Sequence, residues 1–173
     1  MPALRRTPIP IPVQAAVYFR DGWPCSLCRR PTIFHLALKQ LAGLTAREFP
    51  GTATSYWNVR WSRQGASLMD ELAACIDHVE AFATGGAHDI TNFATACARC
   101  NQRKNSGKKD DFLARSRLYV AKGRSGEPTE WDGLSAAFVA LARGSHISLP
   151  STDTAWLAAL EAHFAHRARV AVD

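Results

Sequence analysis

The stretch DHVEAFATGGAHDITNFATACARCNQRK, residues 77–104, carries most of the information about the fold. Residues 74–82 have the composition of a β-strand, and the Gly-Gly pair that follows predicts a turn. Residues 92–105 predict a helix that carries a C-x-x-C pair and a basic tail. An isolated Asp-His pair such as Asp77-His78 is usually a surface or capping feature, so its role depends on the residues around it.

The chain has five cysteines, and four of them form two C-x-x-C pairs. An odd count argues against a framework of disulfides alone, while two C-x-x-C pairs favour a metal site. Because thiolates are soft ligands and four of them close a tetrahedral site, the sequence predicts structural zinc bound by Cys25, Cys28, Cys97 and Cys100. An iron–sulfur cluster usually has a closely spaced cysteine run, which is missing here, and a redox C-x-x-C would explain only one pair. Cys75 is expected in the core.

Asp77-His78, the Gly-Gly turn, Asn92 and the second C-x-x-C pair with Asn101 directly after it occur together with the upstream pair CSLC at 25–28. This set resembles the HNH endonuclease family, including the spacing of 14 residues from His78 to Asn92 and of 9 residues from Asn92 to Asn101. The resemblance covers residues 25–28 and 76–105. It implies an α+β fold with a ββα-metal (His-Me finger) core, stapled by a four-cysteine zinc site and extended by helices at both ends.

By the same resemblance, His78 is the general base that activates water, and Asn92 pins the loop and orients that base. Asp77 and Asn101 hold a catalytic divalent ion, Mg²⁺ or Mn²⁺, through hard oxygen ligands. Phosphodiester hydrolysis needs a positioned water, a base and a cation that stabilises the developing charge, so these residue types suit the reaction.

Neighbouring side chains in a flat strand point to opposite faces. Asp77 and His78 can therefore serve one site only at a strand end, at a bulge or in a strongly twisted segment. The sequence also departs from the family pattern at Ala81, where the family often has Pro, and at His88, where a small polar residue is common. His88 is expected to be a turn residue, with phosphate contact or a spare base as the alternatives.

The formal net charge is +6, and residues 99–124 contain nine Lys or Arg against two Asp. Such an excess suits a phosphate backbone, and a solvated surface explains it equally well. The residues predicted to contact nucleic acid are Arg99, Arg103, Lys104, Lys108 and Lys109 near the metal helix, and Arg60 and Arg63 farther upstream. Those two arginines alternate with aromatic residues, which indicates either stacking on bases or an aromatic core cluster.

The predicted organisation is a Pro-rich arm at 1–12, a nuclease domain at 13–122 with an insert at 32–74, and a C-terminal helical extension at 123–173 that packs on or near the core. Pro12 is expected in the first turn of a helix. Thr32 is expected to cap a second helix that ends near Gly43. Two amphipathic helices are expected in the C-terminal extension.

These features predict a metal-dependent HNH endonuclease, a monomer or homodimer that acts on DNA rather than RNA. The alternative is a zinc-stapled nucleic-acid-binding module with weak or no nuclease activity. A restriction, toxin or defence nuclease shares the same chemistry. No apolar run reaches the roughly 18 residues of a membrane span, and prolines interrupt the apolar part of the N-terminus, so a soluble cytoplasmic protein is expected.

Overall fold

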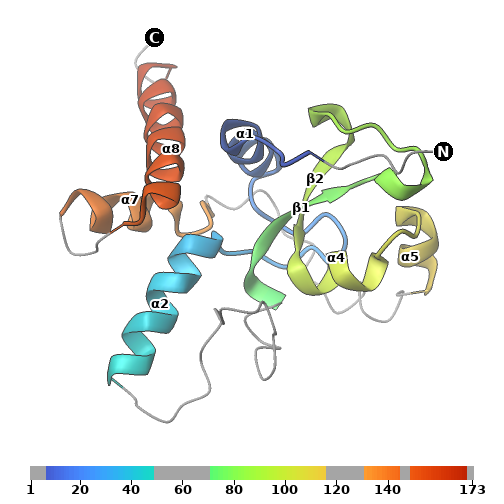
Figure 1. The fold of residues 1–173 in the computed structure, drawn as a ribbon, viewed down its shortest axis with the longest axis horizontal. Helices are drawn as coiled ribbons and strands as arrows, with labels where there is room; N and C mark the ends of the chain where they lie inside the picture. The colour runs from blue at the N-terminus through green and yellow to red at the C-terminus, as the bar shows by residue number, and fades with distance from the viewer. Residues whose placement is uncertain (1–6, 49–70, 116–130, 145–148, 171–173) are drawn as a thin grey trace.

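The computed structural model describes residues 7–48, 71–115, 131–144 and 149–170. The elements in chain order are α1 (Ile11–Asp21), α2 (His35–Glu48), β1 (Ala74–His78), the 3-10 turns η1 (Phe82–Thr84) and η2 (Ile90–Asn92), β2 (Phe93–Cys97), α4 (Ala98–Lys104), α5 (Lys109–Arg115), α7 (Ser135–Arg143) and α8 (Ser151–Val170). The described part is thus a mixed structure of helices and one two-stranded sheet, as the α+β expectation requires. Figure 1 shows α4 and α5 to the right of the sheet and α2, α7 and α8 to its left. Residues 49–70 of the predicted insert, including Arg60 and Arg63, lie outside the described residues.

The sheet consists of β1 and β2, which pair antiparallel from Ala74 opposite Cys97 to His78 opposite Phe93 without interruption. The sequence predicts one helix over residues 92–105, and this is wrong for its first part, because β2 is a strand and α4 begins only at Ala98. All five residues of β2 are buried. Pairing with β1 satisfies their backbone groups, and this outweighs the low strand propensity of the alanines.

The outer edge of β2 is held by the end of α1 and by the loop that follows it. Arg20 donates from Nη2 to the carbonyl oxygen of Phe93 at 2.6 Å. The amide of Thr95 donates to Asp21 Oδ2 at 2.7 Å, and the carbonyl of Thr95 accepts from the amide of Ser26 at 2.8 Å. Edge groups that would otherwise need water are therefore hydrogen-bonded within the protein.

The helices share an aromatic core. Tyr18 of α1 stacks on Trp23 with ring centroids 5.0 Å apart, and Phe34 lies edge-on to Phe138 of α7 at 5.3 Å. Trp156 of α8 lies 5.1 Å from Phe34. All five rings are buried, so the C-terminal helices α7 and α8 enclose the same core as α1. None of the described helices is long and apolar enough to span a membrane.

The first two helices follow the sequence prediction in part. Pro12 lies in the first turn of α1 as expected. α2 begins at His35 and continues through Gly43, so Thr32 does not cap it and Gly43 does not end it. Thr32 is instead fully buried, and its hydroxyl donates to the carbonyl of Trp23 at 2.5 Å. A glycine inside a helix costs only about 1 kcal/mol, which tertiary packing of the helix readily offsets.

Residues 131–133, just before α7, are hydrogen-bonded to the loop that leads from the first cysteine pair to α2. Trp131 Nε1 donates to the carbonyl of Thr32 at 2.6 Å, and the carbonyl of Gly133 accepts from the amide of Phe34 at 2.8 Å. Gly133 has φ +68°, and a Cβ atom there would lie 2.3 Å from the ring of Trp23. Only glycine combines this backbone conformation with so close an approach.

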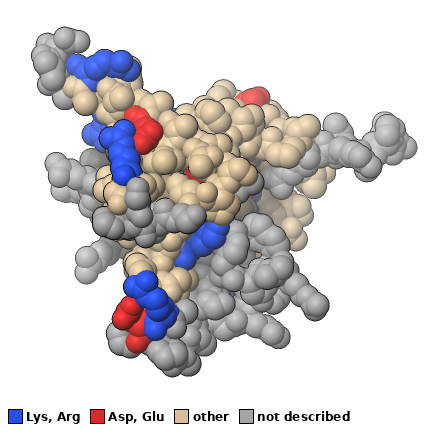
Figure 2. Space-filling model, turned by 60° about the vertical axis from the view of Figure 1, so that its left-hand side comes forward, with Lys and Arg blue, Asp and Glu red and all other residues tan. Residues whose placement is uncertain are grey.

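Charged side chains on the helical side of the molecule are paired across elements. Lys39 of α2 contacts Asp153 of α8 at 2.9 Å, and Arg143 of α7 contacts Glu161 of α8 at 2.7 Å. Figure 2, which brings this side forward, shows Lys and Arg at separate positions with wide uncharged areas between them. The described part of this face is therefore not one continuous basic surface.

Replacing Gly133 with Ala is expected to lower the free energy of unfolding by about 2–4 kcal/mol, because the new methyl group meets Trp23 and the positive φ disfavours alanine. Urea denaturation followed by tryptophan fluorescence measures the effect. Gly43→Ala is the matched control, since a Cβ at Gly43 has nothing within 4 Å, and it is expected to stabilise α2 slightly. Equal stability of Gly133→Ala and wild type would contradict the packing described here.

Candidate functional site

The four cysteines of the two C-x-x-C pairs lie together, with all four ligand atoms within 4.8 Å of one another and all four residues buried. Cys25 and Cys28 lie in the loop after α1, whereas Cys97 ends β2 and Cys100 lies in the first turn of α4. The amide of Cys28 donates to Cys25 Sγ at 3.5 Å, and the amide of Cys100 donates to Cys97 Sγ at 3.4 Å. Both C-x-x-C pairs therefore have the same local geometry, in which the sulfur of the first cysteine accepts a hydrogen bond from the amide of the second.

The donor set fits a zinc ion. Zinc–sulfur bonds of about 2.3 Å place the sulfurs of a tetrahedral site about 3.8 Å apart, and the Cys28 and Cys97 sulfurs are 4.0 Å apart. All the cysteines are free thiols, so no disulfide occupies these sulfurs. Hydrogen bonding with Cys100 lowers the pKa of Cys25 and raises the pKa of Cys97. A dication bound by the four sulfurs would let all four thiols ionise.

Asp77 is buried near the end of β1 and forms an ion pair with the last residue of α4. Lys104 Nζ lies 3.0 Å from Asp77 Oδ1 and 2.6 Å from the carbonyl oxygen of His78. Asp77 is 3% exposed and Lys104 is 2% exposed. Burial raises the pKa of Asp77, while the hydrogen bond and the charge of Lys104 oppose that rise. The carboxylate therefore depends on a nearby cation to stay ionised in this environment.

His78 is also buried, but its ring has other neighbours than Asp77. His78 Nε2 lies 3.0 Å from His88 Nδ1, and the ring meets Phe93 edge-on with centroids 4.9 Å apart. Phe93 is the cross-strand partner of His78, and the register of the sheet is regular at Asp77 and His78. The strand therefore has no bulge at these positions. In this structure, the Asp77 carboxylate contacts Lys104 of α4, and the His78 imidazole contacts His88 from the loop between the strands.

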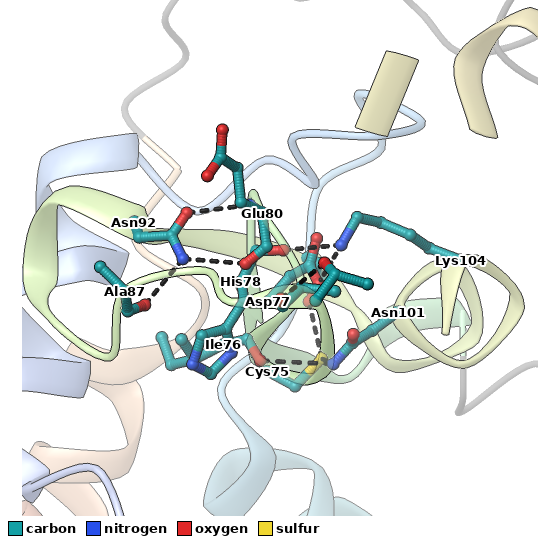
Figure 3. A network of polar contacts seen from close by, with 12 residues as sticks. Cys75, Ile76, Asp77, His78, Glu80, Ala87, Asn92, Asn101 and Lys104 are labelled. Carbon is teal, nitrogen blue, oxygen red and sulfur yellow. Dashed lines mark hydrogen bonds and ion pairs between the residues drawn. The ribbon is translucent and has the colours of Figure 1, made fainter. Parts of the chain in front are cut away.

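Asn101 follows the second cysteine pair and faces β1. Its Nδ2 donates to the carbonyl of Ile76 at 3.3 Å and to Cys75 Sγ at 3.4 Å (Figure 3). These contacts fix the orientation of the amide, because a carbonyl can only accept. The amide oxygen of Asn101 is then the atom left for a cation.

Asp77, His78 and Asn101 line one pocket of about 650 Å³. The remaining lining residues come from the loop after β1 and from the end of α4 and the turn after it, namely Ala81, Phe82, Ala83, Gln102, Lys104, Asn105 and Ser106. Carboxylate and amide oxygens are the ligands that Mg²⁺ prefers, so the donors at this pocket fit a hard divalent ion. The pocket brings together three of the four residues that the sequence predicts for the catalytic site, whereas Asn92 is not among its lining residues.

Asn92 holds the loop that connects the strands. Its Oδ1 accepts from the amide of Glu80 at 2.9 Å, and its Nδ2 donates to the carbonyls of Glu80 at 2.9 Å and of Ala87 at 2.7 Å. Figure 3 shows Asn92 between Glu80 and Ala87. The loop also requires Gly86, where a Cβ atom would lie 2.0 Å from the carbonyl oxygen of Glu80. These contacts are those of a residue that fixes a loop, as the resemblance implies for Asn92.

The residues predicted to contact nucleic acid have different surroundings. Arg103 and Lys108 are exposed and Lys109 is half-buried. Arg99 is half-buried and forms an ion pair with Glu71, which also binds an arginine of the first cysteine loop. Lys104 differs most from the expectation, because its side chain is enclosed and already bound to Asp77. Its ammonium is not available to a phosphate in this structure.

Two contacts of the site are not predicted from the sequence: Lys104 with Asp77, and His88 with His78. A signal for Lys104 is present, because it follows Cys100 by four residues and a pair at that spacing shares one helix face. Cys100 is buried, so Lys104 has to lie close to the same buried face. Nothing in the sequence pattern indicates the contact between His88 and His78.

Asn92→Ala is expected to lower the free energy of unfolding by about 2–4 kcal/mol, since it removes three partly buried hydrogen bonds of about 1 kcal/mol each. Urea denaturation measures the loss. Gln102→Ala, on the exposed side of α4, serves as the control and is expected to stay within about 0.5 kcal/mol of wild type. A loss as small as that of the control would contradict the role of Asn92 in the loop.

Cys97→Ser is expected to lose bound zinc and to unfold at a much lower temperature, because the free energy of metal binding is part of the folding free energy. Elemental analysis of the purified protein and thermal denaturation provide the two readouts. Cys75→Ser is the matched control, since Cys75 lies outside the four-cysteine cluster and donates to the carbonyl of Ala96. It should keep its zinc, and full zinc retention by Cys97→Ser would exclude the site.

Residues 67–107 match the family model described as HNH endonuclease. The match contains β1, β2 and α4, and thereby Asp77, His78 and Asn101, whereas Cys25 and Cys28 lie upstream of it. The chain has no significant match to a curated protein or to a solved structure. The resemblance to the HNH endonuclease family stated from the sequence is confirmed by this match over residues 67–107.

Proposed function

We propose that this protein is a metal-dependent endonuclease that hydrolyses phosphodiester bonds in DNA. The observation that carries the proposal is the pocket lined by Asp77, His78 and Asn101, which lies inside the segment that matches the HNH family. Nuclease or nucleic-acid-binding function follows from the family; the choice of DNA and the roles of individual residues belong to the proposal.

Asp77 and Asn101 are the proposed ligands of a divalent ion, Mg²⁺ or Mn²⁺, through a carboxylate oxygen and an amide oxygen. Such an ion would polarise the scissile phosphate and stabilise negative charge on the leaving oxygen. The hydrogen bonds from Asn101 to β1 support this assignment, because they fix the amide so that its oxygen is the atom left for the ion.

His78 is the proposed general base. Histidine is the side chain that most often acts as a general base in enzymes. The contact of His78 Nε2 with His88 Nδ1 supports this role, because it holds the imidazole in one orientation at the pocket. The loop fixed by Asn92 carries His88, so the same loop supports the orientation of the base.

The proposed substrate contacts are the basic residues around α4 and α5. Arg103 and Lys108 are exposed, and a phosphate bound at the pocket would lie near the helix that carries Arg103. Contacts of this type position a nucleic acid without reading its sequence. The four-cysteine cluster, with zinc bound, would act as a staple and not as a catalyst, since four protein ligands leave no open position.

A nucleic-acid-binding module without nuclease activity is the second candidate, and one observation favours it. Asp77 is already neutralised by Lys104, and His78 is 3% exposed and enclosed by His88, Phe93 and Phe82. In the nuclease, both groups must become accessible to substrate, whereas a binding module has no such requirement.

Plasmid digestion with Mg²⁺ distinguishes the two functions. Wild type is expected to cleave DNA with Mg²⁺ and not with EDTA, and His78→Ala is expected to lose about 10²–10⁴-fold in rate, the usual contribution of a general base. His166→Ala, an exposed histidine on α8, is the matched control and should cleave like wild type. Cleavage by His78→Ala at the wild-type rate would exclude the assigned base, and binding without any cleavage by wild type would favour the binding module.

A further inference from the structure

Lys104 is a buried lysine, and the contacts described for its ammonium group are both with oxygen atoms. Its Nζ lies 3.0 Å from Asp77 Oδ1 and 2.6 Å from the carbonyl oxygen of His78, and the side chain is 0% exposed. Figure 3 shows it reaching from α4 to the end of β1, beside Asn101. The ammonium thus lies at the wall of the pocket, beside the oxygen atoms that are the proposed metal ligands.

Burying a charged lysine away from water costs free energy unless the ammonium is paired with an opposite charge. Here the pairing is with Asp77, a carboxylate that is itself buried. The attraction between the two charges offsets their desolvation cost, and loss of either group leaves an uncompensated buried charge. The pair keeps the pocket wall close to neutral in the absence of any metal.

We propose that Lys104 is a resident cation of this pocket, which neutralises Asp77 when no divalent ion is bound and competes with that ion for the carboxylate. The inference rests on the proposed function in one respect, namely that Asp77 is a metal ligand. Lys104 is then a positioning residue that sets the divalent-ion affinity of the site, and it is not a phosphate contact.

The competition follows from charge and position. A dication bound to Asp77 would lie within a few ångströms of the ammonium, and like charges at that range in a buried site repel strongly. The ion therefore binds either against this repulsion or after the ammonium has moved. The pocket offers space for such a movement, because Lys104 itself lines this cavity of about 650 Å³. In both cases, Lys104 weakens metal binding.

Mn²⁺ titration of the full-length chain tests the competition. Lys104→Met is expected to bind Mn²⁺ at least about tenfold more tightly than wild type in isothermal titration calorimetry, because the competing charge is gone. Without divalent ions, the same variant is expected to melt at a lower temperature than wild type, and Mn²⁺ is expected to restore most of that loss.

Lys39→Met is the matched control. Lys39 also pairs with a poorly exposed aspartate, since its Nζ lies 2.9 Å from Asp153 Oδ2, but neither residue lines the pocket. Its melting temperature is expected to fall, and Mn²⁺ is not expected to restore it. A purely structural role for Lys104 predicts the same behaviour for both lysine variants, so equal Mn²⁺ responses would overturn the proposal.

Two further variants keep the test decisive if Lys104→Met does not fold. Lys104→Gln retains a donor for the carbonyl of His78 without the charge, and it should show the same tighter Mn²⁺ binding. Asp77→Asn combined with Lys104→Met removes both charges. It is expected to fold without metal and to lose the Mn²⁺ response, whereas a retained response would place the ion elsewhere and overturn the proposal.

Cleavage assays separate this inference from the proposed function. If wild type cleaves DNA with Mg²⁺ while Lys104→Met binds Mn²⁺ no more tightly than wild type, the competition is excluded and the nuclease remains. Tighter Mn²⁺ binding by Lys104→Met without DNA cleavage by wild type supports the competition and rejects the nuclease. If Mn²⁺ binds to neither protein, both proposals fail.

Discussion

The four-cysteine cluster is the constraint on which the rest of the structure depends. It joins the loop after α1 to the junction of β2 and α4, two places separated by 68 residues of sequence between Cys28 and Cys97. A two-stranded sheet is marginal by itself in water. In this protein, the sheet gains stability because β2 ends in the cluster and because α1 and its loop hold the outer edge of β2. The pocket is lined by Asp77 of β1 and Asn101 of α4, so the positions of both residues depend on the cluster that anchors these short elements.

The parts of the site that can be predicted from the sequence are those in which residue type and spacing act together. Two C-x-x-C pairs are sufficient to predict the cluster, because four thiols at this spacing are typical of a metal site and of few other structures. The set of Asp77, His78 and Asn101 follows from the HNH resemblance, and these residues do line one pocket. The loop contacts of Asn92 likewise have the form that the resemblance implies.

The parts that the sequence analysis does not predict depend mainly on tertiary contacts. The alanines of β2 favour a helix, although burial and pairing with β1 decide the conformation of this segment. Lysine is rarely buried, so Lys104 is expected at the surface, and only the carboxylate of Asp77 makes its burial possible. α2 runs through Gly43 because packing of the helix outweighs the propensity of one residue. In each case, the tertiary environment overrides the average behaviour of a residue type.

The contacts of Arg20 and Asp21 with β2 also bear on how copies of the protein can associate. An unpaired strand edge is a template on which a second chain can add a strand, and this is a common route to domain swapping and fibrous aggregates. Here the amide of Thr95 and the carbonyl of Phe93, the groups such an added strand would use, are already engaged by side chains from α1. Two copies of the protein are therefore not expected to pair through this edge of β2 into a sheet continuous across both molecules.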